Sequence, residues 1–120
     1  MKITAMVLVI FVAVFHVLVL MLEMFFWDTP TGHRIFGLTS ETAKITRTLA
    51  MNQGLYNGFL AAGLFWGAFS KRFDVKVFFL VCVIVAGVFG GATAKPSLLF
   101  TQGLPALLAL VAVWLAQKKA

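Results

Sequence analysis

Four long apolar runs, separated by short polar segments, organise the chain. They cover residues 3–22, 49–69, 75–94 and 98–116. Each run has about twenty residues, and twenty residues of α-helix span about 30 Å, the thickness of a bilayer's hydrocarbon core. The pattern predicts an all-α protein, a four-helix transmembrane bundle that forms a single integral membrane domain over residues 1–120.

The outer connection, residues 23–48, is the longest polar segment. Within it, Asp28-Thr29-Pro30-Thr31-Gly32 predicts a turn, since proline and glycine both interrupt helices. Thr39 or Ser40 is a suitable N-cap, and Glu41 would lie at the positive end of the helix dipole. We therefore expect the second helix to begin near Ser40, well before its apolar part.

Composition supports a membrane protein. The chain is 62% hydrophobic with a net charge of +6 over 120 residues, and its mean hydropathy is +1.01. A soluble domain of this length could not bury so much apolar surface. The basic residues lie in short clusters beside apolar runs and form no continuous stripe, which argues against nucleic acid as a partner. The single cysteine, Cys82, lies inside an apolar run and is interpreted as a buried, inert thiol.

The distribution of charges predicts the orientation. With four spans, both termini and the central turn lie on one side. That side has six basic residues and one acid, while the other side has four basic residues and three acids: Lys2, Lys71, Arg72, Lys76, Lys118 and Lys119 with Asp74, against Arg34, Lys44, Arg47 and Lys95 with Glu23, Asp28 and Glu41. The positive-inside rule then predicts a multi-pass protein of the cell membrane with cytoplasmic N- and C-termini.

A polar cluster, Asn52-Gln53-Gly54-Leu55-Tyr56-Asn57-Gly58, opens the second run. Each hydrogen-bonding side chain left without a partner in hydrocarbon costs roughly 2–7 kcal/mol, so these side chains need partners. Most of the other polar side chains of the spans also fall at their outer ends: Glu23, Thr93, Lys95, Thr101 and Gln102. We therefore expect a polar pocket that opens outward, covered by residues 24–48 and floored by His16 near mid-membrane.

Within this pocket the residue types suggest roles. Candidate ligand-binding residues are Trp27, Asn52, Gln53, Tyr56, Asn57, Thr93 and Gln102. Glu23 and His16 are the candidates for catalysis or proton exchange. Seven helical residues place these two within roughly 20° of one face but about 10 Å apart along the axis, so they can line one cavity without sharing a metal ion. We predict no metal site, and the cofactor is unknown. His33 is expected to lie solvated in the connection.

Simpler interpretations remain open. Glu23 could pair at the membrane boundary with Arg34, Arg47 or Lys95, and the amides could join helices without binding a ligand. Rows of small residues four apart allow close helix packing, within the chain or against a second copy: Gly54, Gly58 and Ala62; Gly63 and Gly67; Ala86 and Gly90; Gly87 and Gly91. No recognised catalytic motif is present.

Three functions are consistent with these features. The leading hypothesis is a protein that binds or carries a small amphiphilic molecule. One alternative is an intramembrane lipid-modifying enzyme or isomerase with Glu23 and His16 as acid and base. The other is a structural or assembly subunit whose small-residue faces pack against another protein or against a second copy in a homo-oligomer.

Several of these segments resemble a family of small four-helix integral membrane proteins of bacteria and fungi, a domain-of-unknown-function family. The resemblance covers almost the whole chain and rests on His16, Glu23-Met24-Phe25-Phe26-Trp27, Phe36-Gly37-Leu38, the Asn52–Gly58 cluster, Ala86-Gly87-Val88-Phe89-Gly90 with Thr93, and Gln102-Gly103-Leu104-Pro105-Ala106. It implies a four-span bundle and no assigned activity. Separately, we expect the membrane to be a bacterial cytoplasmic membrane.

Arg47, Asn52 and Tyr56 are also similar to the membrane-associated eicosanoid and glutathione metabolism family, whose members are four-helix bundles, usually trimers, that bind glutathione and lipids. The chain departs from that pattern, because Leu55 stands where the family has an acidic residue and the arginine-rich glutathione contacts are largely missing.

Overall fold

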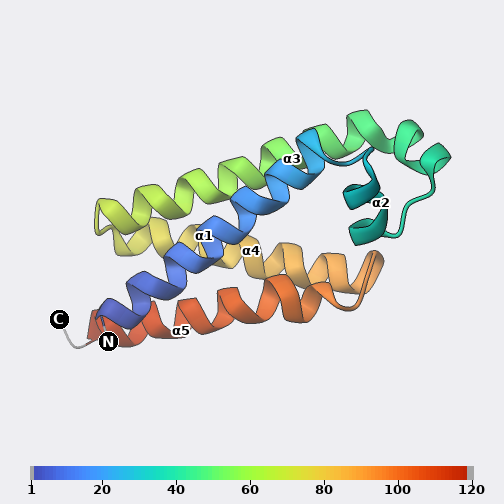
Figure 1. Cartoon of the computed structure of the whole chain (residues 1–120). Coiled ribbons are helices and arrows are strands. Elements are labelled where there is room, and N and C mark those ends of the chain that lie inside the picture. Colours follow the sequence, from blue (N-terminus) through green and yellow to red (C-terminus); the bar gives the residue numbers. More distant parts are fainter. Residues whose placement is uncertain (1, 119–120) are drawn as a thin grey trace. The chain divides into compact units, whose positions relative to one another are not determined.

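The computed structural model describes residues 2–118, whose regular secondary structure is all helical (Figure 1). Its elements in chain order are α1 (Lys2–Phe25), α2 (Pro30–Phe36), α3 (Ser40–Phe69), α4 (Phe73–Thr93), the π-helix η1 (Leu99–Gly103) and α5 (Leu104–Lys118). The all-α prediction is confirmed. The chain divides into two compact units, one made of the residues up to Val14 and from Leu60 onward, the other of Phe15–Phe59.

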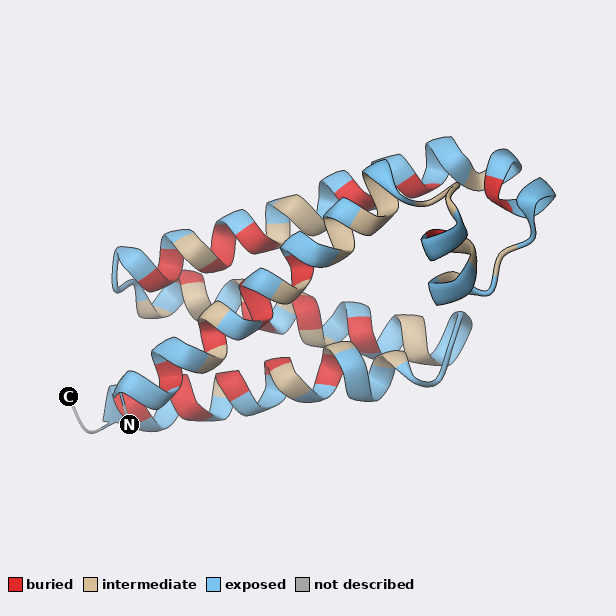
Figure 2. Cartoon of the chain, in the orientation of Figure 1, coloured by how far each residue is buried: buried red, intermediate tan, exposed pale blue. Residues whose placement is uncertain are grey.

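The first unit has one apolar core to which four helices contribute. Val9 and Ala13 come from α1, Leu64 from α3, Leu80 from α4 and Ala109 from α5, and each is fully buried. Along α5 the buried positions are Ala106, Ala109, Ala112, Val113 and Ala116. This spacing of three and four residues forms one helical stripe, which is visible in Figure 2 as regularly spaced buried segments. Alanine at these positions lets neighbouring backbones approach closely.

The connection from α4 to α5 combines a tight turn with a π-helix. Lys95-Pro96-Ser97 forms the predicted turn, in which the Leu98 N–H donates to the Lys95 carbonyl at 3.0 Å. η1 then widens the first turn of the predicted fourth span, and the Leu104 N–H closes it on the Leu99 carbonyl. A Cβ added at Gly87 would lie 2.7 Å from the Gly103 backbone nitrogen, so α4 and η1 touch through their backbones.

The turn from α3 to α4 forms a Schellman motif. The Arg72 N–H donates to the Gly67 carbonyl at 3.0 Å, and the Lys71 N–H donates to the Ala68 carbonyl at 3.4 Å. Lys71 has φ 56°, the left-handed conformation that glycine usually supplies in this motif. A lysine at this position costs about 1–2 kcal/mol of conformational energy.

The second unit contains the end of α1, α2 and the first part of α3. The sequence predicted that Pro30 and Gly32 would each break a helix, but α2 begins at Pro30 and runs through Gly32. Proline at the first helical position loses no intrahelical bond, and the Thr29 hydroxyl accepts from the Gly32 N–H at 3.2 Å as the N-cap. Gly32 is required because a Cβ there would collide with the Phe26 and Trp27 carbonyls. The N-cap predicted for the next helix is confirmed, since the Thr39 hydroxyl accepts from the Thr42 N–H at 3.0 Å.

Among the described residues 2–118, three helices are long and apolar enough to cross a membrane: Lys2–Phe25, Phe73–Thr93 and Leu99–Lys118. Large apolar side chains on these helices, such as Phe11, Phe78 and Leu108, point away from the core and are more than half exposed. Both observations are consistent with a membrane protein. α3 is not among the three, although it has 30 residues, because the amide side chains between Asn52 and Asn57 lower its mean hydropathy.

Candidate functional site

A hydrogen bond between α1 and α3 forms the centre of the candidate site in the second unit. The Asn57 side-chain amide donates from Nδ2 to Glu23 Oε1 at 2.7 Å. The same amide donates to the Gln53 carbonyl at 3.1 Å, which holds Asn57 against its own helix. Glu23 and Asn57 are both half-buried. A carboxylate has about four acceptor sites, so one amide donor leaves room for further donors.

Two glycines of α3 bring the helices close enough for this bond. A Cβ at Gly54 would lie 3.2 Å from Glu23 Cβ and 3.2 Å from the Leu20 carbonyl oxygen. A Cβ at Gly58, one turn later, would lie 2.6 Å from Leu20 Cδ1. The predicted role of the Gly54 and Gly58 row in close packing is confirmed, and its partner is the chain's own α1.

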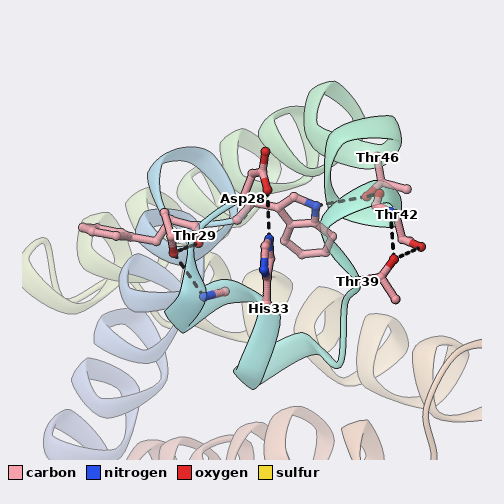
Figure 3. A network of polar contacts seen from close by, with 9 residues as sticks. Asp28, Thr29, His33, Thr39, Thr42 and Thr46 are labelled. Atoms are coloured by element: carbon pink, nitrogen blue, oxygen red, sulfur yellow. Dashed lines mark hydrogen bonds and ion pairs between the residues drawn. The ribbon is translucent and has the colours of Figure 1, made fainter.

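Trp27 lies in a separate set of contacts, which joins the turn after α1 to the first part of α3. Its indole Nε1 donates to the Thr46 hydroxyl at 3.0 Å, and its ring packs on Phe36 with centroids 4.6 Å apart. The Thr46 hydroxyl donates in turn to the Thr42 carbonyl at 2.7 Å (Figure 3). The role of Thr46 as the partner of Trp27 was not predicted. Its spacing of four residues from Thr42 was the available signal, because it places the two hydroxyls on one helix face.

His33 was expected to lie solvated in the connection, and its side chain is only partly exposed. It lies in α2, and its Nε2 is 2.8 Å from Asp28 Oδ1, so the two side chains form an ion pair when His33 is protonated (Figure 3). Both side chains are only about one quarter exposed, at 27% and 21%. The turn before Pro30 brings the residues together although they are five positions apart.

The remaining polar side chains of the cluster do not join Glu23. Asn52 donates to the Thr48 carbonyl of its own helix at 3.0 Å and is exposed. Gln53 and Tyr56 are also exposed, and the Tyr56 ring lies 6.1 Å from the Phe59 ring. An amide or hydroxyl that bonds to its own helix is satisfied without a ligand, so the cluster is less concentrated than the sequence predicted.

Thr93 and Gln102 belong to the first unit. The Thr93 hydroxyl donates to the Phe89 carbonyl of its own helix at 2.7 Å and is exposed. Gln102 is half-buried within η1. Their predicted contribution to the same pocket stays a prediction.

His16 is almost completely buried, at 1% exposed, and its ring lies edge-on to Phe15 with centroids 5.5 Å apart. It is on the same continuous helix as Glu23, and seven residues of that helix rise about 10 Å. The two groups cannot exchange a proton directly over that separation.

Arg34 and Arg47, the possible ion-pair partners of Glu23 that lie in the second unit, do not pair with it. Among residues 2–118, Glu23 forms no ion pair with Arg34 or Arg47, and its partner is the neutral amide of Asn57. Within the same described range, no three His, Cys, Asp or Glu side chains are grouped so that they could hold a metal ion.

Neither of two hollows in the first unit is lined by a predicted site residue. The larger has a volume of about 470 Å³ and is lined by both lysine and apolar side chains. The smaller, about 210 Å³, lies between α4, η1 and α5 and is lined by apolar residues and Gly103.

Comparison with known proteins identifies relatives. A curated relative, "Uncharacterized protein YpaA" of Lactococcus lactis subsp. lactis (strain IL1403), is 30% identical over 115 residues, which covers 92% of this chain and 97% of the relative. No solved structure matches the chain at a significant level. The profile of the DUF1304 family, described as "Protein of unknown function", matches residues 10–114. Because that match covers most of the chain, the resemblance to a family of unknown function is confirmed: the chain belongs to the DUF1304 family.

Proposed function

We propose that this protein crosses the membrane four times, with cytoplasmic termini, and binds or carries a small amphiphilic molecule at Glu23 and Asn57. The observation that carries the proposal is the hydrogen bond between these two half-buried side chains on different helices.

α3 is the proposed additional span. Its last part contributes Leu64 and Ala68 to the same core as the three apolar helices, and a Cβ at Gly67 would lie 2.9 Å from the Lys76 backbone nitrogen of α4. A helix of 30 residues is about 45 Å long, more than a bilayer's hydrocarbon core requires. Two of its amide side chains, Asn52 and Asn57, form hydrogen bonds within the chain, which lowers the cost of placing them in a membrane.

The chemistry around Glu23 suits an amphiphile. The carboxylate accepts hydrogen bonds, and Leu20 and Met24 from α1 pack beside it against Gly54 and Gly58. A ligand with a hydroxyl, amine or amide head group could donate to the remaining lone pairs of Glu23, while its apolar part remains among the side chains or in the lipid. Charged and amide groups placed inside membrane proteins commonly mark such sites.

The rows of small residues favour assembly between copies of the chain less than the Glu23 site favours ligand binding. Gly54 and Gly58 pack against Leu20, Gly63 against Phe79 and Gly91 against Leu99, all within this chain. Substitution of these glycines would therefore disturb the fold before any association between copies.

The test is native mass spectrometry of the full chain extracted gently from its own membrane. We expect a stoichiometric adduct that is not a phospholipid, and we expect Glu23→Gln to lose it. Glu41→Gln is the matched control, because Glu41 is an exposed acid in the first turn of α3. An adduct equally abundant in both variants, or no adduct in the wild type, would refute binding at Glu23.

The orientation is tested separately by cysteine labelling. In a Cys82→Ala background, Ser70→Cys marks the turn between α3 and α4, and Ser97→Cys marks the turn before η1. We expect a membrane-impermeant maleimide added to intact cells to label Ser97→Cys and to leave Ser70→Cys unlabelled. The reverse pattern, or the same labelling of both, would contradict the proposed topology.

A further inference from the structure

The larger hollow lies where the ends of four helices meet in the first unit. It is lined from α1 by Lys2 and Met6, from the turn after α3 by Lys71, from the start of α4 by Phe73 and Lys76, and from the end of α5 by Gln117, among others. Its volume of about 470 Å³ is within the range of ligand pockets. It contains none of the residues assigned above to the amphiphile site.

The charges in this hollow, which we call the lysine hollow, are unbalanced. Lys2 comes from the start of α1, while Lys71 and Lys76 flank the start of α4, and no acidic residue is among the lining residues. The acid beside it in the sequence, Asp74, is engaged by Arg72, whose Nε and Nη2 donate to its two carboxylate oxygens at 3.0 and 2.7 Å. An anion in the hollow would relieve the mutual repulsion of the three ammonium groups.

Two of these lysines are held by specific backbone features. Lys71 takes the left-handed position of the Schellman motif, where glycine would be free of strain. The stem of Lys76 crosses Gly67, because a Cβ at Gly67 would lie 2.8 Å from Lys76 Cγ. Charges that only orient a protein in the membrane need neither feature, since they act by lying near the membrane surface.

The rest of the lining is largely apolar and includes Met6, Phe73 and Val113. These residues lie at the ends of helices that are long and apolar enough to cross a membrane. Ammonium groups beside apolar walls at the edge of a bilayer match a phosphate head group with acyl chains, and basic pockets between membrane helices are known to bind such head groups.

We propose that the lysine hollow binds the phosphate group of an anionic membrane phospholipid, with Lys2, Lys71 and Lys76 as its ligands. The phosphate chemistry is shared with free inorganic phosphate, and the apolar walls favour the lipid as its source.

The experiment uses the full chain, delipidated in a neutral detergent. Binding is measured by native mass spectrometry with phosphatidylglycerol, with phosphatidylcholine of the same acyl chains, and with inorganic phosphate. We expect the wild type to prefer phosphatidylglycerol at least tenfold. We expect the triple variant Lys2→Gln, Lys71→Gln, Lys76→Gln to lose that preference.

The matched control is Lys44→Gln, Arg47→Gln, Lys95→Gln, which removes the same charge from exposed positions outside the hollow. It should keep the preference. Equal affinity for the two lipids, an equal loss in both triple variants, or phosphate binding as tight as lipid binding would overturn the proposal.

Lys71→Gly separates the charge from the fold. Glycine accepts the left-handed turn, so the variant should unfold at a higher temperature than the wild type while binding phosphatidylglycerol several-fold more weakly. A variant that is more stable and binds the lipid as well as the wild type would exclude Lys71 as a ligand.

Discussion

The Asn57 side chain donates to the Glu23 carboxylate over 2.7 Å and joins α3 to α1 across 34 positions of sequence. A charge-assisted bond of this kind is stronger than one between neutral groups. Asn57 is therefore the amide of the α3 cluster that bonds to α1, whereas Asn52 bonds to the backbone of its own helix.

The first prediction concerns this bond. Asn57→Ala leaves the half-buried Glu23 carboxylate without its amide donor, and we expect a loss of about 1–3 kcal/mol in the free energy of unfolding. Asn52→Ala is the matched control, because it removes an exposed amide and should change stability by less than about 0.5 kcal/mol. Thermal unfolding in mild detergent, followed by circular dichroism, measures both. Equal shifts in the two variants would show that the interhelical bond contributes nothing.

The second prediction concerns the close approach of α1 and α3. Alanine favours helix over glycine by about 1 kcal/mol, yet Gly54→Ala should lower the midpoint of thermal unfolding. Its Cβ would lie 3.2 Å from both Glu23 Cβ and the Leu20 carbonyl oxygen, and crowding of this kind typically costs about 1–3 kcal/mol.

Gly103→Ala is the control for that crowding, because the nearest atom to a Cβ there is the Leu98 carbonyl oxygen at 3.9 Å. It should leave the midpoint unchanged or raise it. A Gly54→Ala protein as stable as Gly103→Ala would contradict the described helix contact.

The third prediction compares two glycines of the connection. Gly32→Ala would drive a Cβ into the Phe26 and Trp27 carbonyls, so α2 should no longer pack against the turn that follows α1. A Cβ at Gly37 would meet no atom within 4 Å, so Gly37→Ala costs only the strain of a φ of +65°, about 1–2 kcal/mol. Hydrogen exchange should therefore be much faster over residues 30–36 in Gly32→Ala than in Gly37→Ala. Similar protection of the segment in both variants would rule out the tight packing of Gly32.

The fourth prediction is a coupling energy between Trp27 and Thr46. Trp27→Phe keeps an aromatic ring beside Phe36 but removes the indole donor, and Thr46→Val removes the acceptor. A double-mutant cycle isolates their interaction from the other effects of each change, including the lost Thr46 bond to the Thr42 carbonyl. We expect a coupling of about 0.5–1.5 kcal/mol from thermal or denaturant unfolding. Strict additivity of the two changes would disprove the bond.

Much of the fold could be predicted from local patterns. Apolar length predicted the long helices, the Thr39 cap predicted where α3 begins, and Lys95-Pro96-Ser97 predicted a turn. The helix at Pro30 and the π-helix at Leu99 were not predicted. Both depend on how the chain packs. Gly32 lies against the Phe26 and Trp27 carbonyls, and Gly103 lies against Gly87.

The candidate site was predicted as a set of residue types and only partly as a geometry. Glu23 and Asn57 do meet, but Asn52 and Thr93 bond within their own helices. The sequence cannot distinguish these outcomes, because an amide or hydroxyl on a helix can be satisfied either by its own backbone or by a neighbouring helix.

The sequence by itself determined that the chain is helical and apolar enough for a membrane, because helix length and hydrophobicity are properties of contiguous residues. It also determined which positions are small enough for close packing. The tertiary structure alone decided that Gly54 and Gly58 pack against Leu20 and that Asn57 rather than Asn52 bonds to Glu23. It alone also decided that Lys2 lines one hollow with Lys71 and Lys76, which lie far from it in sequence. Those pairings depend on the rotation and register of whole helices, which no short stretch of sequence specifies.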